Sequence, residues 1–417
     1  MRKMSAIIIG AVAATAGAEE PAAWPRFRGP DGAGRAAGSA VFPVRVEPKD
    51  LRWSADLPGG GHSSPVVWGG KVFVTAADEA SGARRVLCVS LADGKTLWNT
   101  DLGGGAAYRK HKFNSFASST PTVDARRVYV CWATPEQLTA VALDHDGKEV
   151  WRRDLGPHRS QHGFGVSPVR HGDLLILPDD QDGGGRVLAL DAATGKDRWS
   201  LPRRSGNATY STPLVRTRPD GSAEMILANW KHGITAVDPA AGKVLWEMSV
   251  FDPGRPERAI GSPIAAGDLI VGTCGFHTGQ RHLVAVRPPA GPDDKPTEAW
   301  RIERAVPHIP TPLAVGGRLF LWNDQGIVTC VNPADGKTVW QQRIGGNYYG
   351  SPVAAGDRIY CVSNEGELVV IAAADECRIL GRSKLGEGCQ STPAIAGGMM
   401  VVRLRSRLVA VSAEAGK

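Results

Sequence analysis

Short apolar runs, separated by polar, glycine-rich turns, follow one another along the whole chain. The clearest stretch begins at Ser167-Pro168 and continues into the apolar run of residues 174–177. A second apolar run, residues 187–190, leads through a turn at Gly195-Lys196 to Trp199. Each run is too short for an ordinary helix and has the length of a strand. The pattern predicts units of four short strands joined by tight turns.

The start of this unit, a Ser or Thr followed by Pro and an apolar run, returns eight times. The prolines are Pro65, Pro121, Pro168, Pro213, Pro263, Pro312, Pro352 and Pro393, separated by 40 to 56 residues. A unit of this length cannot bury its own apolar faces and must stack against copies of itself. Four-stranded units are typical of propeller blades, and a closed ring leaves no long exposed sheet edge. We predict an all-β fold, an eight-bladed β-propeller of four-stranded antiparallel blades.

The two ends of the chain predict how the ring closes. The chain stops at Lys417, where the eighth unit should enter its last strand. Residues 51–57 carry an outer-strand tryptophan, Trp53, but precede the first Ser-Pro. We expect this N-terminal strand to complete the last blade, so that residues 51–417 form a single propeller domain.

A tryptophan recurs near the end of most units, usually after a Gly-Lys turn. Its spacing matches the blade, and an aromatic side chain there can hold neighbouring sheets together. Two units differ, because Trp300 follows an insertion at residues 288–298 and the seventh unit has residues 377–380 where tryptophan is expected. We interpret the set as structural: Trp53, Trp98, Trp151, Trp199, Trp246, Trp300 and Trp340.

The first 50 residues precede the predicted ring. Residues 1–18 are typical of a cleaved signal peptide, with basic Arg2 and Lys3 followed by an apolar stretch and small residues. Residues 19–50 are expected to form an extended arm whose Trp24 and Phe27 fill a surface groove. We expect a periplasmic or secreted protein, with no lipidated cysteine near the cleavage point and no run long enough to span a membrane.

Charge and cysteine content narrow the possible partners. Without residues 1–18 the chain has 47 basic and 42 acidic residues, spread along its length. Nucleic-acid binding favours a clustered basic surface, so we expect no nucleic-acid partner.

The seven cysteines include no CxxC and no adjacent pair, and most lie in apolar strand segments. We interpret them as small buried apolar residues rather than a disulfide framework, and we expect a monomer.

The segments that lead into each Ser-Pro or Thr-Pro are expected to surround the mouth of the central channel. They lie on the face with the longer loops, where rigid scaffolds usually carry their binding residues. Their aromatic, amide and imidazole groups suit a polar small ligand, a carbohydrate or a peptide. The alternative is that they only hold neighbouring blades together. The candidate ligand-binding residues are His62, Asn114, Phe116, His162, Phe164, Asn207, Tyr210, Arg258, His308, Asn347, Tyr348, Tyr349 and Gln390.

Two weaker patterns concern metal ions. The polar segment 179–185 contains Asp180 and Asp182, whose carboxylates are candidate ligands for Ca²⁺. The segment lacks the full spacing and the distal Glu of an EF-hand, so a solvated acidic loop is the favoured interpretation. His62, His162 and His308 come from different units and form a second, less favoured metal set.

Three features of the unit resemble the pyrroloquinoline-quinone (PQQ)-like β-propeller repeat. They are the Ser-Thr-Pro start, the third strand Leu188-Ala189-Leu190-Asp191 and the Thr194-Gly195-Lys196 turn before tryptophan. Similar repeats occur in quinoprotein alcohol dehydrogenases and in BamB, the outer-membrane assembly lipoprotein. The resemblance covers residues 24–417, and it implies the fold more strongly than the function, because one propeller fold hosts unrelated activities.

For the quinoprotein dehydrogenases, the resemblance implies PQQ between a Trp and a ring of two adjacent oxidised cysteines, Ca²⁺ on acidic and amide groups, and an Asp base. This chain has no adjacent cysteines, no matching constellation and no haem-attachment motif. Common catalytic motifs such as Gly-x-Ser-x-Gly and His-Glu-x-x-His are also missing. We therefore assign no catalytic residue and no cofactor, with PQQ and Ca²⁺ disfavoured.

The resemblance and the missing motifs together favour a non-catalytic binding scaffold of the cell envelope. Like BamB, such a scaffold would dock another envelope protein. The first alternative is a small-ligand or carbohydrate site at the channel mouth. The second, which is disfavoured, is a quinoprotein-type dehydrogenase.

Overall fold

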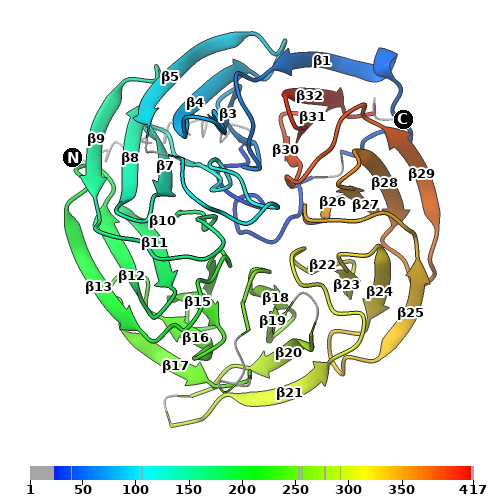
Figure 1. Ribbon diagram of the computed structural model, residues 1–417. Helices are drawn as coiled ribbons and strands as arrows, with labels where there is room; N and C mark the ends of the chain where they lie inside the picture. Colours follow the sequence, from blue (N-terminus) through cyan, green and yellow to red (C-terminus); the bar gives the residue numbers. More distant parts are fainter. Residues whose placement is uncertain are drawn as a thin grey trace, which may run out of the picture.

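Eight four-stranded antiparallel sheets stand around a central axis in the computed structural model, as the repeat predicts (Figure 1). The structure describes residues 23–38, 40–104, 107–251, 254, 257–276, 279–291 and 293–414. The predicted signal peptide, residues 1–18, lies outside them. Within the described residues, no helix is long and apolar enough to cross a membrane.

Seven blades are continuous in sequence, and each runs from an inner to an outer strand. The first blade contains β2 (Val66–Trp68), β3 (Lys71–Ala77), β4 (Ala83–Ser90) and β5 (Thr96–Gly104), and the second contains β6 (Thr122–Val123), β7 (Arg127–Ala133), β8 (Leu138–Asp144) and β9 (Glu149–Asp154). The third blade contains β10 (Val169–His171), β11 (Leu174–Gln181), β12 (Gly184–Asp191) and β13 (Asp197–Arg203), and the fourth contains β14 (Leu214–Thr217), β15 (Ala223–Asn229), β16 (Gly233–Val237) and β17 (Val244–Met248). The fifth blade contains β18 (Ile264–Ala266), β19 (Leu269–Gly275), β20 (Arg281–Arg287) and β21 (Thr297–Ile302). The sixth contains β22 (Leu313–Val315), β23 (Arg318–Trp322), β24 (Ile327–Val331) and β25 (Thr338–Arg343). The seventh contains β26 (Val353–Ala355), β27 (Arg358–Val362), β28 (Glu367–Ala372) and β29 (Ile379–Lys384).

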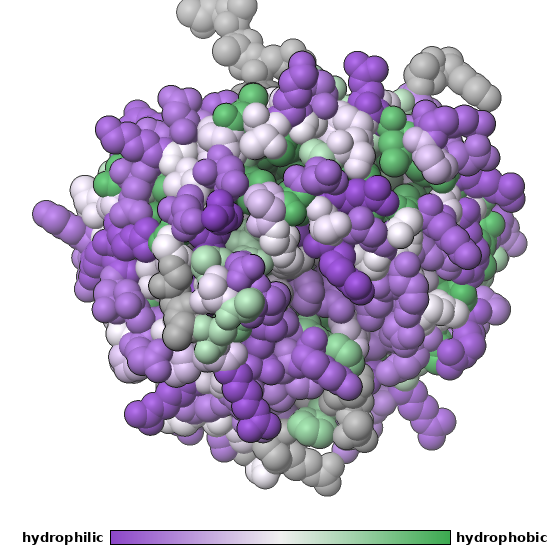
Figure 2. All heavy atoms as spheres, turned by 45° about the horizontal axis from the view of Figure 1, so that its top comes forward, coloured by the Kyte–Doolittle hydropathy of each residue, from purple (hydrophilic) through white to green (hydrophobic). Residues whose placement is uncertain are grey.

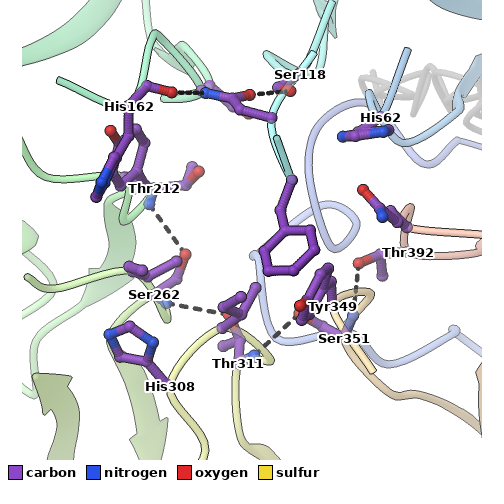
Figure 3. Close-up of a pocket in the computed structure, with 18 of the residues that line it drawn as sticks. His62, Ser118, His162, Thr212, Ser262, His308, Thr311, Tyr349, Ser351 and Thr392 are labelled. Atoms are coloured by element: carbon purple, nitrogen blue, oxygen red, sulfur yellow. Dashed lines mark hydrogen bonds between the residues drawn. The ribbon is translucent and has the colours of Figure 1, made fainter. Parts of the chain in front are cut away.

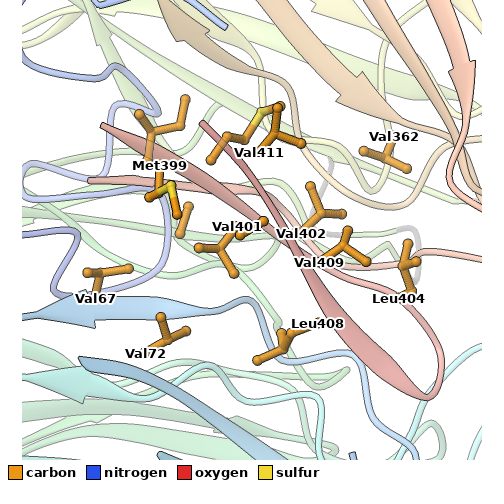
Figure 4. Packing of buried hydrophobic residues seen from close by; sticks show 14 of the residues in the cluster. Val67, Val72, Val362, Met399, Val401, Val402, Leu404, Leu408, Val409 and Val411 are labelled. Carbon is orange, nitrogen blue, oxygen red and sulfur yellow. The ribbon is translucent and has the colours of Figure 1, made fainter. Parts of the chain in front are cut away.

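The eighth blade joins the two ends of the chain. Its strands β30 (Ala394–Ala396), β31 (Met399–Arg403) and β32 (Arg407–Ser412) are completed by β1 (Leu51–Asp56), which follows a short 3₁₀ turn, Pro48–Asp50. β1 pairs antiparallel with β32, and Trp53 lies opposite Ala410. A buried cluster continues from Val401 and Val409 of this blade to Val67 and Val72 of the first blade (Figure 4). The predicted closure of the ring is confirmed.

The outer strand of every blade contains a β-bulge at the same place. In the second blade, for example, Trp151 pairs with Ala142 and Glu149 pairs with Leu143, so Val150 is the extra residue. A bulge twists the strand locally and re-aims its side chains. Here it leaves Trp151 9% exposed and turns Val150 outward, at 44% exposure.

Hydrogen-bonded tryptophans join six of the eight blades to the next blade. Six of them donate their indole N–H to a backbone carbonyl in the next blade's turn, at 2.8–3.2 Å. In the second blade's turn, a Cβ on Gly147 would lie 2.7 Å from the ring of Trp98, and Gly147 has φ +82°. The glycine of the Gly-Lys turn is therefore required both by its backbone conformation and by the indole packed on it.

In two places a different contact replaces the hydrogen bond from the tryptophan to the next blade's turn. The fifth blade lacks the Gly-Lys turn, and Trp246 of the fourth blade donates instead to Glu224 of its own blade at 3.2 Å. In the seventh blade the residue in register with the tryptophans is Gly381, one position beyond the predicted segment 377–380. The carbonyl oxygen of Val44 occupies the place of a Cβ at Gly381. The N-terminal arm therefore packs where the other blades have an indole.

Four of the large apolar side chains on the surface lie at the same place in their blades. Leu97, Val150, Leu245 and Val339 are the bulged residues of their outer strands. The face in Figure 2 is covered mainly by hydrophilic residues, with small apolar spots between them. Scattered apolar residues of this kind are normal on a soluble surface.

The N-terminal arm crosses the centre of the ring, where its blue trace is visible in Figure 1. It pairs with Val67 through Trp24, accepts a hydrogen bond from Val123 at Pro25 and exchanges hydrogen bonds with Ala354. The prediction that Trp24 and Phe27 fill a surface groove is wrong for Phe27, which lines a central pocket. The physical reason is that Arg28 anchors the arm on the axis by donating to three carbonyls of the inner-strand starts, those of Thr311, Pro312 and Pro352.

All seven cysteines are unpaired, and all except the partly exposed Cys377 are buried. Their interpretation as small apolar residues rather than disulfides is confirmed.

Candidate functional site

A pocket of about 580 Å³ lies on the propeller axis. Its wall includes the residue before the proline of all eight units: Ser64, Thr120, Ser167, Thr212, Ser262, Thr311, Ser351 and Thr392. The ring geometry brings these positions together because each one lies two residues before the innermost strand of its blade. We call this set the hydroxyl ring.

Hydrogen bonds connect the hydroxyl ring from blade to blade (Figure 3). The backbone N–H of Thr212 donates to the hydroxyl of Ser262, and that of Ser262 donates to Thr311, both at 3.0 Å. The same link, at 2.9–3.0 Å, joins seven of the eight neighbouring pairs; the Ser167–Thr212 pair lacks it. Every Ser or Thr of the ring except Thr212 therefore satisfies a buried N–H of the preceding blade. The Ser-Pro and Thr-Pro repeat predicts where each inner strand starts, but not that the hydroxyls line one pocket.

The pocket contains many of the residues predicted at the channel mouth. Those that line it are His62, Asn114, His162, Tyr210, Arg258, His308, Tyr349 and Gln390. The other five candidates do not line it. Phe116, Phe164 and Tyr348 are buried in apolar packing, and the amides of Asn207 and Asn347 bond to Glu257 and Glu365. Ligand binding by the lining residues remains a prediction.

One connection between blades reaches further into the pocket than the sequence suggested. His111, Lys112 and Phe113, between the first and second blades, all line the pocket. The ring of Phe113 lies 5.2 Å from that of Tyr349, which precedes the seventh blade, and His111 lies 4.8 Å from His162. This segment therefore spans from one side of the pocket to the other. The 56-residue separation of Pro65 and Pro121, the longest in the chain, was the available signal.

Two histidines of the pocket, His62 and His162, are neutral at ordinary pH. Burial, reinforced by Arg403, Lys110 and Arg405, lowers the pKa of His62 to about 3. Burial, reinforced by Arg258 and His111, lowers the pKa of His162 to about 4. Burial also raises the pKa of Tyr210 to about 12. The pocket therefore offers neutral imidazoles and a phenol that can donate or accept hydrogen bonds.

The histidines do not converge as a metal site. His62, His162 and His308 lie on different sides of the pocket (Figure 3). Across the part of the chain that the structure describes, no three His, Cys, Asp or Glu side chains are grouped so that they could hold a metal ion.

The prediction that the acidic segment 179–185 is a solvated loop is wrong. β11 and β12 continue through most of it as a tight hairpin, and Asp179 and Asp180 are buried. Asp180 pairs with Arg203 at 3.2 Å and accepts a hydrogen bond from Asn229 at 2.8 Å. Asp182 accepts hydrogen bonds from the backbone N–H groups of Gln161 and Ala208. These carboxylates are bonded to protein donors, which makes them structural in this fold.

The donor set of the pocket does not fit the quinone–calcium arrangement of the dehydrogenases. Calcium ions require several oxygen ligands, usually carboxylates. The described residues that line the pocket include no Asp, Glu, Trp or Cys. We derive no chemical step through PQQ or calcium here.

Fold and pocket together define an eight-bladed propeller whose axial channel holds a pocket floored in part by its own N-terminal arm. The model of a family described as "Outer membrane protein assembly factor BamB" matches residues 39–104, 82–291 and 231–417. The chain belongs to this family of PQQ-like β-propellers.

Individual relatives are distant. BamB of Bordetella pertussis is 23% identical over 375 residues, which are 87% of this chain and 86% of the relative. Quinohemoprotein alcohol dehydrogenase ADH IIB of Pseudomonas putida is 26% identical over 36% of this chain and 21% of its own length. A europium-containing methanol dehydrogenase superposes with a TM-score of 0.70 at 12% identity, covering 94% of this chain and 98% of that chain. At this identity the superposition shows the shared fold alone.

Proposed function

We propose that this protein is a non-catalytic binding propeller of the cell envelope that takes a small polar ligand in the central pocket. The observation that carries the proposal is the composition of the pocket. Its lower wall is the same hydroxyl in every blade, whereas the loops above it supply different side chains, such as His62, Tyr210 and Gln390. A regular scaffold with varied loop residues at one concave place is typical of a binding site. The envelope location is supported by the BamB relatives.

The volume of the pocket also supports a small ligand. Pockets of about 300–1,000 Å³ hold drug-sized molecules, and this pocket measures about 580 Å³. Its polar groups are held in place by neighbouring blades, so little ordering is needed when a ligand binds.

Filling the pocket tests this proposal. Ile260 lines the pocket, and the substitution Ile260→Trp would occupy part of its volume. The matched control is Leu245→Trp on an outer strand, where Leu245 is 38% exposed. In a thermal-shift screen of neutral sugars, amino acids, short peptides and organic acids, at least one compound should raise the Tm of the wild type and of Leu245→Trp. Ile260→Trp should lose that response, and an equal response in all three proteins would contradict the proposal.

A second candidate function is docking of another envelope protein. It is supported by the length of the match to B. pertussis BamB, which covers 86% of that protein. Cross-linking of the purified protein in envelope extract should then give one discrete adduct that Ile260→Trp also forms. Loss of the adduct in Ile260→Trp would point back to the pocket.

A further inference from the structure

The charged groups that line the central pocket are cationic. Arg258 and Lys112 line it, and the described lining residues include no carboxylate. Lys112 is exposed at the pocket's edge, whereas Arg258 is only 5% exposed. The pocket therefore has one buried and one exposed positive charge.

Arg258 is held in position and still has donors to offer. A backbone bridge to Gly275 fixes it, and its Nη1 donates to the carbonyl of Ala208 at 3.0 Å. The same nitrogen lies 3.5 Å from Asp182, which itself accepts two backbone hydrogen bonds and does not line the pocket. Among the described residues, the partners of this guanidinium are all at Nη1, and a guanidinium has five N–H groups. The others can donate to a ligand.

Two more arginines add positive charge close to the pocket. Arg403 is 1% exposed, and within the described part of the chain it donates to Ser63 and to the carbonyl of Thr75, which are neutral. Arg28 is fully buried next to Phe27 and donates to backbone carbonyls. Burial lowers the pKa of both to about 9, so both remain charged at neutral pH. Among the described residues Arg403 has no carboxylate partner, whereas Asp31 partly offsets the burial of Arg28. Buried charges that are incompletely paired are costly, and an anion nearby offsets that cost.

The lowered pKa values of two histidines are consistent with the same positive potential in the pocket. The pKa of His62 is lowered by burial and then by Arg403, and that of His162 by burial and then by Arg258. A positive potential that disfavours a protonated imidazole favours an anion in the same space.

Part of the pocket wall is apolar. Phe27, Ile260, Ile309, Phe113 and Phe276 line the pocket, and the last two are 38% and 47% exposed although they are large and apolar. Exposed aromatic side chains around a cavity are typical of a surface that a ligand covers. A hydrated inorganic ion would leave this apolar wall without a partner.

We propose that the pocket selects an organic anion, in which a carboxylate or phosphate lies at Arg258 and an apolar or aromatic body lies between the phenylalanines. This inference rests on the proposed function and names the ligand class of that site. The hydroxyl ring supplies further neutral donors to the same ligand.

Calorimetric titration with one neutral and two anionic probes tests the inference. Benzoate and phenyl phosphate carry the two anionic groups, and benzamide is the neutral counterpart of benzoate. At pH 7 and low salt, at least one anion should bind the mature protein about tenfold or more tightly than benzamide. The stronger of the two identifies carboxylate or phosphate as the preferred group. Added salt should weaken anion binding.

Variants connect the binding to the proposed residues. Arg258→Gln and Lys112→Gln should each weaken anion binding severalfold, and the control Arg287→Gln, at an exposed ion pair with Asp268, should not. If Arg258→Gln does not fold, the exposed Lys112 variant decides. Benzamide binding as tightly as benzoate, with Ile260→Trp abolishing both, overturns the anion inference and keeps the proposed function. Binding of no probe also overturns the inference, while the pocket-filling screen still judges the proposed function by itself.

Discussion

At the scale of single residues, the hydroxyl ring explains why each unit begins with Ser or Thr. The following proline keeps this residue extended, and its hydroxyl accepts a backbone hydrogen bond from the preceding blade, as between Ser64 and Thr120 at 3.0 Å. A buried N–H that loses its acceptor costs about 1–3 kcal/mol. The ring therefore stabilises the fold and lines the candidate site with the same atoms.

Two threonines of the ring provide a matched test. Thr120→Val removes the acceptor of the Ser64 N–H, whereas at Thr212 the corresponding bond from Ser167 does not exist among the described contacts. Thr120→Val should lower the free energy of unfolding by about 1–3 kcal/mol, and Thr212→Val by less. Urea unfolding followed by circular dichroism measures both. Equal losses would contradict the role assigned to the hydrogen bond.

The low pKa of His62 predicts a pH dependence of stability. In the unfolded chain a histidine takes up a proton near pH 6.5, whereas native His62 resists it until about pH 3. The unfolded state therefore binds more protons between these values, and the free energy of unfolding falls as the pH drops from 7 towards 4. Carboxylates add to this trend mainly below pH 5, so the window from pH 5 to 7 is informative. His62→Gln should show a shallower slope there, and an unchanged slope would contradict the shifted pKa.

At the scale of elements, the contact between an outer tryptophan and the next blade's turn is the repeated joint of the ring. The bulge in each outer strand turns the indole inward, and the glycine of the turn leaves room for it. The sequence predicted this joint from spacing alone. It did not reveal that the arm replaces the indole at Gly381, because nothing in residues 42–46 indicates which blade they contact.

Two glycines separate the effect of the indole from that of the backbone. Gly147 and Gly70 have φ of +82° and +77°, but a Cβ meets Trp98 at Gly147 and open space at Gly70. Gly70→Ala should cost about 1–2 kcal/mol for the left-handed conformation. Gly147→Ala should cost about 1–3 kcal/mol more because it also overpacks the joint. Chemical denaturation of both variants checks this. Similar losses of unfolding free energy would contradict the overpacking, because they would mean that the Trp98 indole moves aside at no cost.

The strand that closes the ring, β1, should contribute as much to the stability of the fold as an internal strand does. Trp53 is 8% exposed and bonds to Leu91 of the first blade. Trp53→Ala should lower the free energy of unfolding by about 3–5 kcal/mol. The control Leu97→Ala, at a bulged residue that is 49% exposed, should change it by about 0.5 kcal/mol or less. A small effect of Trp53→Ala would mean that the ring stays closed without this contact.

At the scale of the whole molecule, the repeat predicts more of the structure than the individual residues do. Eight equal units predicted the number of blades, the closure and the face that carries the longer loops. They also placed His62, His162 and Arg258 around one axis. The repeat could not predict that Asp180 would be buried against Arg203, or that Tyr348 would point into the core while Tyr349 lines the pocket. These outcomes depend on local register and loop course, which no spacing encodes.

Above all, we propose that the segments leading into the eight inner strands form one binding site on the axis. Amide hydrogen exchange with and without the tighter of the two anionic probes tests this directly. We predict slower exchange on binding in the segments that precede the inner strands, such as residues 110–118, 160–167 and 258–262, with no change in the Gly-Lys turns at the rim. Protection confined to the outer strands or turns, with the axial segments unchanged, would contradict the account.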